Sequence, residues 1–468
     1  MSLRTLGVFF FARAAVLLTV GWGALAFGAV YPWAYWPLVG MAAIATSLAV
    51  ASGGSVDVPH RWLLTGIVLF GAAIGAQLVP LSRAALATWS PSTISALNQL
   101  NLPYALGFEP RHALSLNPAA TSAGLAIFLG CAGLTIGVAR VCSSHGVKWL
   151  TAGLTALGLL MALIGIVQKP LYAGKIYGLW TPIQSGQVFG PFVNKNHFAG
   201  WMMMALPVTL GALCAGIDNG MRGVKPVWRE RLLWFGSRDA SQLILNAAAA
   251  AIMGLSLVLT MSRSGIGAFS LAVALTGAFV VFGVTGGVRR TVGTAYLVAL
   301  FALVIGWVGV DVIANRFEQA NWQDYNDRRG AWQDARDIAA MFPKGGTGFG
   351  TYGDATILYQ KHDLAYHFEQ AHNDYLQLAA EGGVLLTVPA MFLAAVIAFQ
   401  ILRRFRDRTG SVTSWWVRAG AVTGLIAIAL QEVVDFSIQM PGNAVLCAVL
   451  IGVALHNAPM PVARRPRP

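Results

Sequence analysis

One polar stretch stands out in an otherwise apolar chain. The segment 311–383 holds 11 of the 19 acidic residues, and three of the eight histidines, His362, His367 and His372, lie there too. Because 56% of the 468 residues are hydrophobic and only 11% are charged, most of the chain is expected to lie in lipid. Chemistry that needs ionisable, water-accessible groups is therefore expected in this stretch.

His372 stands in Ala371-His-Asn-Asp-Tyr375, just before a predicted membrane span. An imidazole titrates near neutral pH, so it could act as general base on a hydroxyl group. The alternative is a histidine that caps or braces the loop. Nothing around His362 and His367 indicates a role.

Arg263 lies in Thr260-Met-Ser-Arg-Ser-Gly265, a short connection between two apolar segments on the side that is poor in basic residues. An arginine at the membrane edge usually faces a polar cavity or an anion. The alternative is a side chain that snorkels to the lipid headgroups. We favour the functional interpretation.

Arg328 and Arg329 precede Gly330-Ala-Trp332 in the polar stretch. A guanidinium group binds phosphate oxygens with two parallel hydrogen bonds and stays charged, so it can neutralise a pyrophosphate leaving group. The alternative is an ion pair with a nearby acid, namely Asp324, Asp327 or Asp334.

Lys195 and His197 enter a span from the same side as the polar stretch. Asn194 and Asn196 beside them could bind sugar hydroxyls, but helix capping is the stronger interpretation for this pair.

Two chemistries are disfavoured. The glycine run 345–350 lacks the Lys-Ser/Thr ending of a nucleotide-binding loop. Asp324 and Asp327 do not form the Asp-x-Asp pair that a divalent metal would need in a glycosyltransferase.

Twelve segments are long and apolar enough to be predicted spans. They are Phe9–Val30, Trp33–Ala51, Leu63–Val79, Ala120–Val141, Leu150–Val167, Phe198–Ala215, Leu243–Met261, Gly267–Val284, Ala295–Val310, Val384–Leu402, Val417–Gln431 and Asn443–Leu455.

The net charge of +13 follows the topology. With twelve spans, most lysines and arginines fall on one side, which predicts that both termini are cytoplasmic and that the polar stretch faces the periplasm. Basic side chains are then expected to contact anionic lipids, and nucleic acid is not an expected partner. The four cysteines show no ligand spacing and none lies in an outer loop, which disfavours disulfides and a zinc cluster.

The predicted organisation has three parts. Residues 1–310 carry spans one to nine with outer loops at 80–118 and 168–197, residues 311–383 form a large outer loop, and residues 384–468 carry the last three spans and a basic tail. Within the large loop, helices are predicted over Arg329–Phe342 and from near Phe368 through His372. Whether Arg13 and Glu432, inside predicted spans, line a path is left open.

Four blocks occur together in this order: Gly190-Pro-Phe-Val-Asn-Lys-Asn-His-Phe-Ala-Gly200; Ser262-Arg-Ser-Gly265; Arg328-x-x-x-Trp332 with Pro343-x-x-Gly346-x-Gly348-x-Gly350-x-Tyr352; and His372-Asn-Asp-Tyr-Leu-Gln377 with Glu381-Gly-Gly383. In combination they resemble the O-antigen ligase / O-antigen polymerase superfamily over roughly 190–384.

The resemblance implies an all-α, polytopic fold of the C-class glycosyltransferase type, with about twelve transmembrane helices and a large helical periplasmic loop. It implies a bacterial inner-membrane enzyme that works without a metal or cofactor. The implied donor is a glycan linked to undecaprenyl pyrophosphate, and in the ligase branch the acceptor is the lipid A–core oligosaccharide.

The resemblance also assigns residues. The implied catalytic groups are His372, Arg263 and Arg328. Substrate-binding roles fall to Arg329, Lys195, His197, Asn196 and Asn373. The arginines would hold the pyrophosphate while His372 takes a proton from the acceptor hydroxyl, in a single displacement that inverts the anomeric centre.

An O-antigen ligase is the leading hypothesis. A polymerase of the same superfamily is the first alternative, because it shares the donor chemistry and differs in the acceptor. A protein O-oligosaccharyltransferase is the next alternative. A transporter or flippase comes last, since the chain shows no two related halves.

Overall fold

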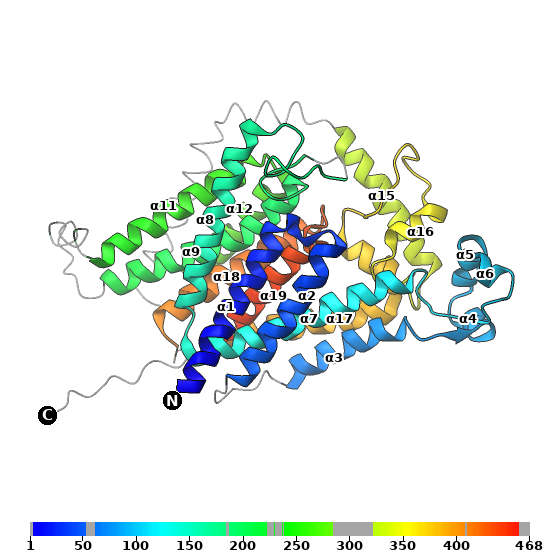
Figure 1. Ribbon diagram of the computed structural model, residues 1–468, viewed down its shortest axis with the longest axis horizontal. Coiled ribbons are helices and arrows are strands. Elements are labelled where there is room, and N and C mark those ends of the chain that lie inside the picture. The colour runs from blue at the N-terminus through cyan, green and yellow to red at the C-terminus, as the bar shows by residue number, and fades with distance from the viewer. Residues whose placement is uncertain are drawn as a thin grey trace.

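The computed structural model describes residues 3–52, 61–183, 187–221, 229, 236, 238–283, 322–407 and 410–457. Within these residues the chain is almost entirely helical (Figure 1). The described strands, β1 (Leu81–Ser82) and β2 (Arg111–His112), form one short antiparallel pair. The expected all-α class is confirmed.

Nine of the described helices are long and apolar enough to cross a membrane, and two shorter apolar helices accompany them. The nine are α1 (Leu3–Leu25), α2 (Pro32–Ala51), α7 (Pro118–His145), α8 (Lys148–Leu171), α9 (Lys195–Met221), α11 (Arg238–Leu259), α12 (Arg263–Gly283), α17 (Asp374–Arg406) and α18 (Val412–Gln431). The shorter two are α3 (Arg61–Ala76) and α19 (Pro441–Leu455). Each corresponds to a predicted span, and the twelfth, Ala295–Val310, lies outside the described residues.

Helices α9 and α18 form the centre of the bundle. Their backbones approach so closely that a Cβ on Gly420 would lie 2.1 Å from the Pro207 carbonyl oxygen, and one on Gly211 would lie 2.5 Å from that of Trp416. Small residues permit such packing in membranes, where apolar burial does not distinguish a helix partner from lipid. The two helices therefore form a fixed frame for the loops at their ends.

The bundle has two distinct ends. At one end, here called the His372 end, α9, α12 and α17 begin and α18 finishes; the carbonyl oxygen of Asn196 accepts from Gln431 there (3.2 Å). At the opposite end α7 finishes and α8 begins, and the Phe9 ring of α1 contacts His145. Helices α15 (Trp322–Met341) and α16 (Tyr352–Tyr359) belong to the His372 end (Figure 1).

The segment 80–117 folds as α4 (Arg83–Trp89), α5 (Pro91–Leu100) and α6 (Leu102–Ala105), which project beyond α3 and α7 (Figure 1). It is tied to the large loop, because Ser92 Oγ donates to the Met341 carbonyl (2.8 Å) and Leu116 N to the Thr347 carbonyl (2.7 Å).

The large loop departs from the prediction in several respects: α15 begins at Trp322 instead of Arg329, and α16 was not predicted. Helix α15 ends before Pro343 as expected, but the prediction that the next helix starts near Phe368 and carries His372 is wrong. Helix α17 starts at Asp374, and His372 precedes its cap. His372 has a φ of +52°, a left-handed conformation that a right-handed helix excludes.

The glycine run 345–350 forms a turn that hydrogen-bonds to Glu381. The Glu381 carboxylate accepts from Gly350 N (2.7 Å) and Tyr352 N (3.1 Å), and these bonds stabilise the start of α16. Gly346 has a φ of +67°, and a Cβ there would lie 2.1 Å from the backbone of Glu381. Glycine is required by this close approach, so the run needs no nucleotide to explain it.

Candidate functional site

One face of α15 fixes two parts of the site. Arg328 Nη1 donates to the Val434 carbonyl (2.8 Å), and one turn later Trp332 Nε1 donates to the His372 carbonyl (3.1 Å). Residues four apart share a helix face, so the Arg-x-x-x-Trp spacing positions the loop after α18 and His372 together. Arg329 is exposed and makes no such bond to a described residue.

His372 is held in a strained backbone conformation with its ring partly enclosed. Its ring meets the Phe436 ring edge to face at 4.8 Å, and its Nδ1 is buried without a hydrogen-bond partner among the described residues. A left-handed non-glycine residue costs free energy and often marks a functional site.

The pKa of His372 is depressed. Burial and the positive charge of Arg328 lower it from 6.5 to about 4; Asp435 acts in the opposite direction, and His197 lowers it slightly. The imidazole is therefore neutral at neutral pH and has a lone pair available to accept a proton.

Acidic groups line the other side of His372. Asp435 is buried, and its Oδ2 accepts from Ser264 Oγ (3.3 Å). The Glu432 carbonyl accepts from Asp374 N (3.0 Å), and its Oε1 accepts from Ile438 N (3.0 Å). Burial, and then the nearby Asp374, raise the pKa of Glu432 well above its usual range.

Arg263 is the first residue of α12, and it sits in a turn fixed by its neighbours. Ser262 Oγ accepts from Gly265 N (3.2 Å) as an N-cap. Ser264 Oγ donates to Asp435 Oδ2. Gly265 packs directly against Ala199 of α9. Arg263 itself is exposed, so its guanidinium can approach a ligand at this rim.

Phe436 lies between two imidazoles. His197 is buried, and its ring meets Phe436 edge to face at 4.8 Å, the same separation as on the His372 side. Both nitrogens of His197 are buried without a hydrogen-bond partner among the described residues. The start of α9 thus belongs to the same site as His372.

Two asparagine side chains accept hydrogen bonds from backbone N–H groups at the starts of helices. Asn194 Oδ1 accepts from Asn196 N (2.8 Å) at the start of α9, and Asn373 Oδ1 accepts from Leu376 N (3.0 Å) as the N-cap of α17. Helix capping, the preferred interpretation for Asn194 and Asn196, is observed for Asn194. Lys195, half-buried, is the first residue of α9.

The other two histidines of the large loop lie apart from this site. His362 Nδ1 bonds to the buried Asp334 Oδ1 (2.7 Å), whose oxygens also accept from Lys361 N and His362 N. His367 is exposed. The Asp334 carboxylate thus binds Lys361 and His362, and it does not form an ion pair with Arg328.

The sequence interpretation missed Asp435 and Phe436, and it placed Glu432 in a span and left its role open. A signal was present, because Glu432 and Asp435 stand three residues apart directly after an apolar segment. Acids at a membrane edge usually mark a polar site. Nothing local, however, connects them to His372, 60 positions earlier.

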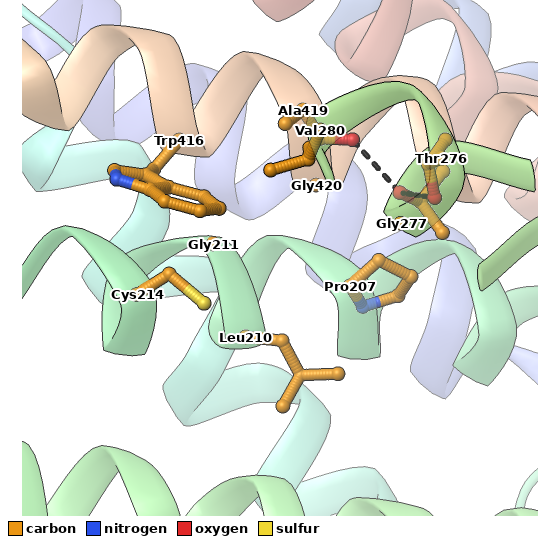
Figure 2. A pocket seen from close by; sticks show the side chains of 11 residues that line it. Pro207, Leu210, Gly211, Cys214, Thr276, Gly277, Val280, Trp416, Ala419 and Gly420 are labelled. Carbon is orange, nitrogen blue, oxygen red and sulfur yellow. Dashed lines mark hydrogen bonds between the residues drawn. The ribbon is translucent and has the colours of Figure 1, made fainter. Parts of the chain in front are cut away.

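A narrow apolar hollow lies elsewhere, between α9, α12 and α18. Pro207, Trp416 and Gly277 are among its lining residues, and Thr276 bonds to Thr423 beside it (Figure 2). Pro207 is 12 residues into α9, about 18 Å along the helix from the His372 end. The hollow contains none of the site's ionisable groups.

Fold and site together define a class: a polytopic, mostly helical membrane protein with a polar site at one end, an arrangement consistent with the C-class glycosyltransferase type. The model of the O-antigen ligase family matches residues 248–391, which include Arg263, Arg328 and His372. This match supports the assignment of the chain to the O-antigen ligase superfamily. No curated protein matches it.

The matched family has a known general activity. Members of this family are glycosyltransferase-like enzymes of lipopolysaccharide synthesis, and in general their substrates are lipid-linked glycans and lipid A–core.

Proposed function

We propose that the protein is an O-antigen ligase of the bacterial inner membrane. It transfers a glycan from undecaprenyl pyrophosphate to the lipid A–core oligosaccharide at the periplasmic face, with both termini in the cytoplasm. One observation carries the proposal: a neutral imidazole, His372, lies beside Arg328 and the Arg263 turn at one end of a membrane bundle.

The catalytic base is His372. Its ring is neutral at neutral pH, so a ring nitrogen has a lone pair available to take the proton of the acceptor hydroxyl. The hydroxyl oxygen then attacks the anomeric carbon from the face opposite the diphosphate and inverts its configuration. Asp435 stabilises the imidazolium that forms, since its negative charge favours the protonated ring.

The leaving group is an anion, and the arginines are placed to bind it. As the bond between the anomeric carbon and the phosphate oxygen breaks, negative charge develops on the diphosphate. Arg263 and Arg328 stabilise that charge, so they lower the barrier to transfer. Binding the dianion also offsets the effect of Arg328 on His372, which makes His372 a stronger base in the complex.

The position of each basic side chain determines the role that we assign to it. Arg328 reaches the loop that carries Asp435, whereas Arg329 is exposed, so we assign the diphosphate to Arg328. Lys195 and His197 are assigned to the donor side of the site, because α9 begins beside the Arg263 turn.

The test is reconstitution. Purified protein is supplied with undecaprenyl-pyrophosphate glycan and lipid A–core without metal, and the joined product is measured. We expect His372→Ala to lower the rate about 10²–10⁴-fold and Arg328→Ala about 10²–10³-fold.

The matched controls are His362→Ala and Arg329→Ala, which remove the same side-chain types outside the site. Full activity in His372→Ala, or equal losses in Arg328→Ala and Arg329→Ala, would contradict the proposed mechanism. Product formed only by joining one donor to another would identify a polymerase. Transfer to a protein acceptor alone would identify an oligosaccharyltransferase, and glycan movement without transfer would identify a flippase.

A further inference from the structure

A second group of unpaired polar side chains lies at the opposite end of the bundle, where α1, α7 and α8 meet. The guanidinium carbon of Arg13 lies 5.6 Å from the centroid of the Trp149 ring, and His145 packs on Phe9 with ring centroids 3.6 Å apart. Phe9 and Arg13 are four residues apart, so they share one face of α1.

Three nitrogens of this group are buried without a hydrogen-bond partner among the described residues. They are Arg13 Nε, His145 Nδ1 and Trp149 Nε1. No described carboxylate forms an ion pair with Arg13 either. Donors buried without an acceptor cost free energy, so the arrangement suits a ligand with negative charge and several acceptor oxygens.

The surroundings favour a ligand that arrives from the bilayer. A stripe of exposed apolar side chains continues from Trp149 along α8 at helical spacing, through Leu160, Leu163 and Val167. On α1, Phe10 lies three residues before Arg13 and is 68% exposed. An acyl chain could therefore lie along α8 while its headgroup reaches Arg13.

We propose that Arg13, His145 and Trp149 bind the phosphate of an anionic phospholipid at the end of the bundle opposite His372. The phosphodiester oxygens accept from the guanidinium and the indole N–H. Basic pockets between membrane helices bind anionic headgroups by this chemistry. The site is separate from the glycan-transfer site and does not depend on the proposed function.

The test is lipid binding to the full-length protein in a neutral detergent, measured by native mass spectrometry and by thermal unfolding. Phosphatidylglycerol, phosphatidylcholine and inorganic phosphate are compared. We expect phosphatidylglycerol to bind in preference to phosphatidylcholine, and Arg13→Gln to weaken its binding about fivefold. Trp149→Phe keeps the ring and removes only the N–H donor, so we expect a smaller loss in the same direction.

The matched control is Arg61→Gln. Arg61 also lies over a tryptophan ring, Trp62 at 5.3 Å, but it is exposed at the start of α3. Its replacement should leave the preference for phosphatidylglycerol intact. An unchanged preference in both Arg13→Gln and Trp149→Phe overturns the site. If inorganic phosphate competes as strongly as phosphatidylglycerol, the ligand of this site is not a lipid.

Discussion

The protonation of His372 depends on charges that come from separate elements of the chain. Arg328 of α15 lowers its pKa, and Asp435 of the loop after α18 raises it. Burial adds the largest effect, in the direction of the neutral ring. A single substitution at either charge should therefore change the pH dependence of catalysis in a known direction.

We predict that kcat/KM of the wild-type protein stays level from pH 8 to pH 5 and falls as the pH approaches 4, because His372 must be neutral to accept a proton. Arg328→Gln removes a positive charge, so the pKa of His372 rises and the acid limb moves to higher pH. The measurement is the pH profile of the residual transfer activity.

Asp435→Asn should move the same limb to lower pH, because it removes the charge that favours imidazolium. Arg329→Gln is the control and should leave the profile unchanged. A wild-type limb centred near pH 6.5 would show that the pKa of His372 is not depressed in the free protein.

Three helices place their first residues at the site. Helix α17 begins at the residue after Asn373, α12 begins at Arg263, and α9 begins at Lys195. A capping side chain fixes the first turn of a helix, so the caps also fix the groups that we propose to react. Asn373 has such a role because it follows His372 directly.

We predict that Asn373→Ala lowers the free energy of unfolding by about 1 kcal/mol, the usual effect of losing an N-cap. It should also lower transfer activity, since the backbone of His372 loses its anchor. Asn373→Ser keeps a capping side chain without adding a charge and should retain both. Thermal unfolding and the transfer assay measure the two effects.

The control for this cap is Asn101→Ala, which removes the bond from Tyr104 N at the start of α6 (3.0 Å), in the segment 80–117. It should lower stability alone. If Asn373→Ser lost activity while keeping stability, Asn373 would act on substrate through its amide.

The turn 345–350 gives a second prediction at this scale. Gly346→Ala places a methyl group against the backbone of Glu381, so we expect it to destabilise the protein by more than about 2 kcal/mol. Gly107 also has a positive φ, +82°, but has open space where a Cβ would lie. Gly107→Ala should therefore cost only about 1 kcal/mol. Equal losses in thermal unfolding would show that packing on Glu381 is unimportant.

At the scale of the whole molecule, two distant parts of the chain bring three buried carboxyl groups together at the His372 end. Glu432 of the α18–α19 loop faces Asp374 of α17 and lies near Asp435. Like charges buried together favour protonation, which makes this junction sensitive to pH.

We predict that the contribution of Glu432 to the stability of the protein falls as the pH rises above about 4.5, because folding raises the pKa of Glu432. The folded state binds this proton more tightly than the unfolded chain, so its stabilising effect is present at low pH. That effect is lost as the pH rises through the folded pKa. Glu432→Gln should flatten the pH dependence of the unfolding temperature.

The exposed Glu369 supplies the control, since Glu369→Gln should leave that dependence unchanged. His372 contributes with the opposite sign: its depressed pKa adds stability above pH 6.5 that is lost as the pH falls toward 4. If the unfolding temperature of Glu432→Gln kept the full pH dependence near neutral pH, a group other than Glu432 would bind the proton.

The apolar segments and the motif residues could be predicted from the sequence. Span composition is local: about 20 apolar residues suffice to cross lipid, so the described helices match the predicted segments. The Arg328-x-x-x-Trp332 spacing is also local, because one helix face carries both side chains. These features need no knowledge of the rest of the chain.

Only the tertiary structure decided how the site is assembled. Asp435 and Phe436 reach His372 because α9 and α18 pack backbone to backbone, and that contact joins residues about 200 positions apart. The choice of Arg328 over Arg329 and the position of His372 outside α17 likewise depend on where the loop after α18 lies. Such contacts are set by packing between distant helices, which no local pattern of residues encodes.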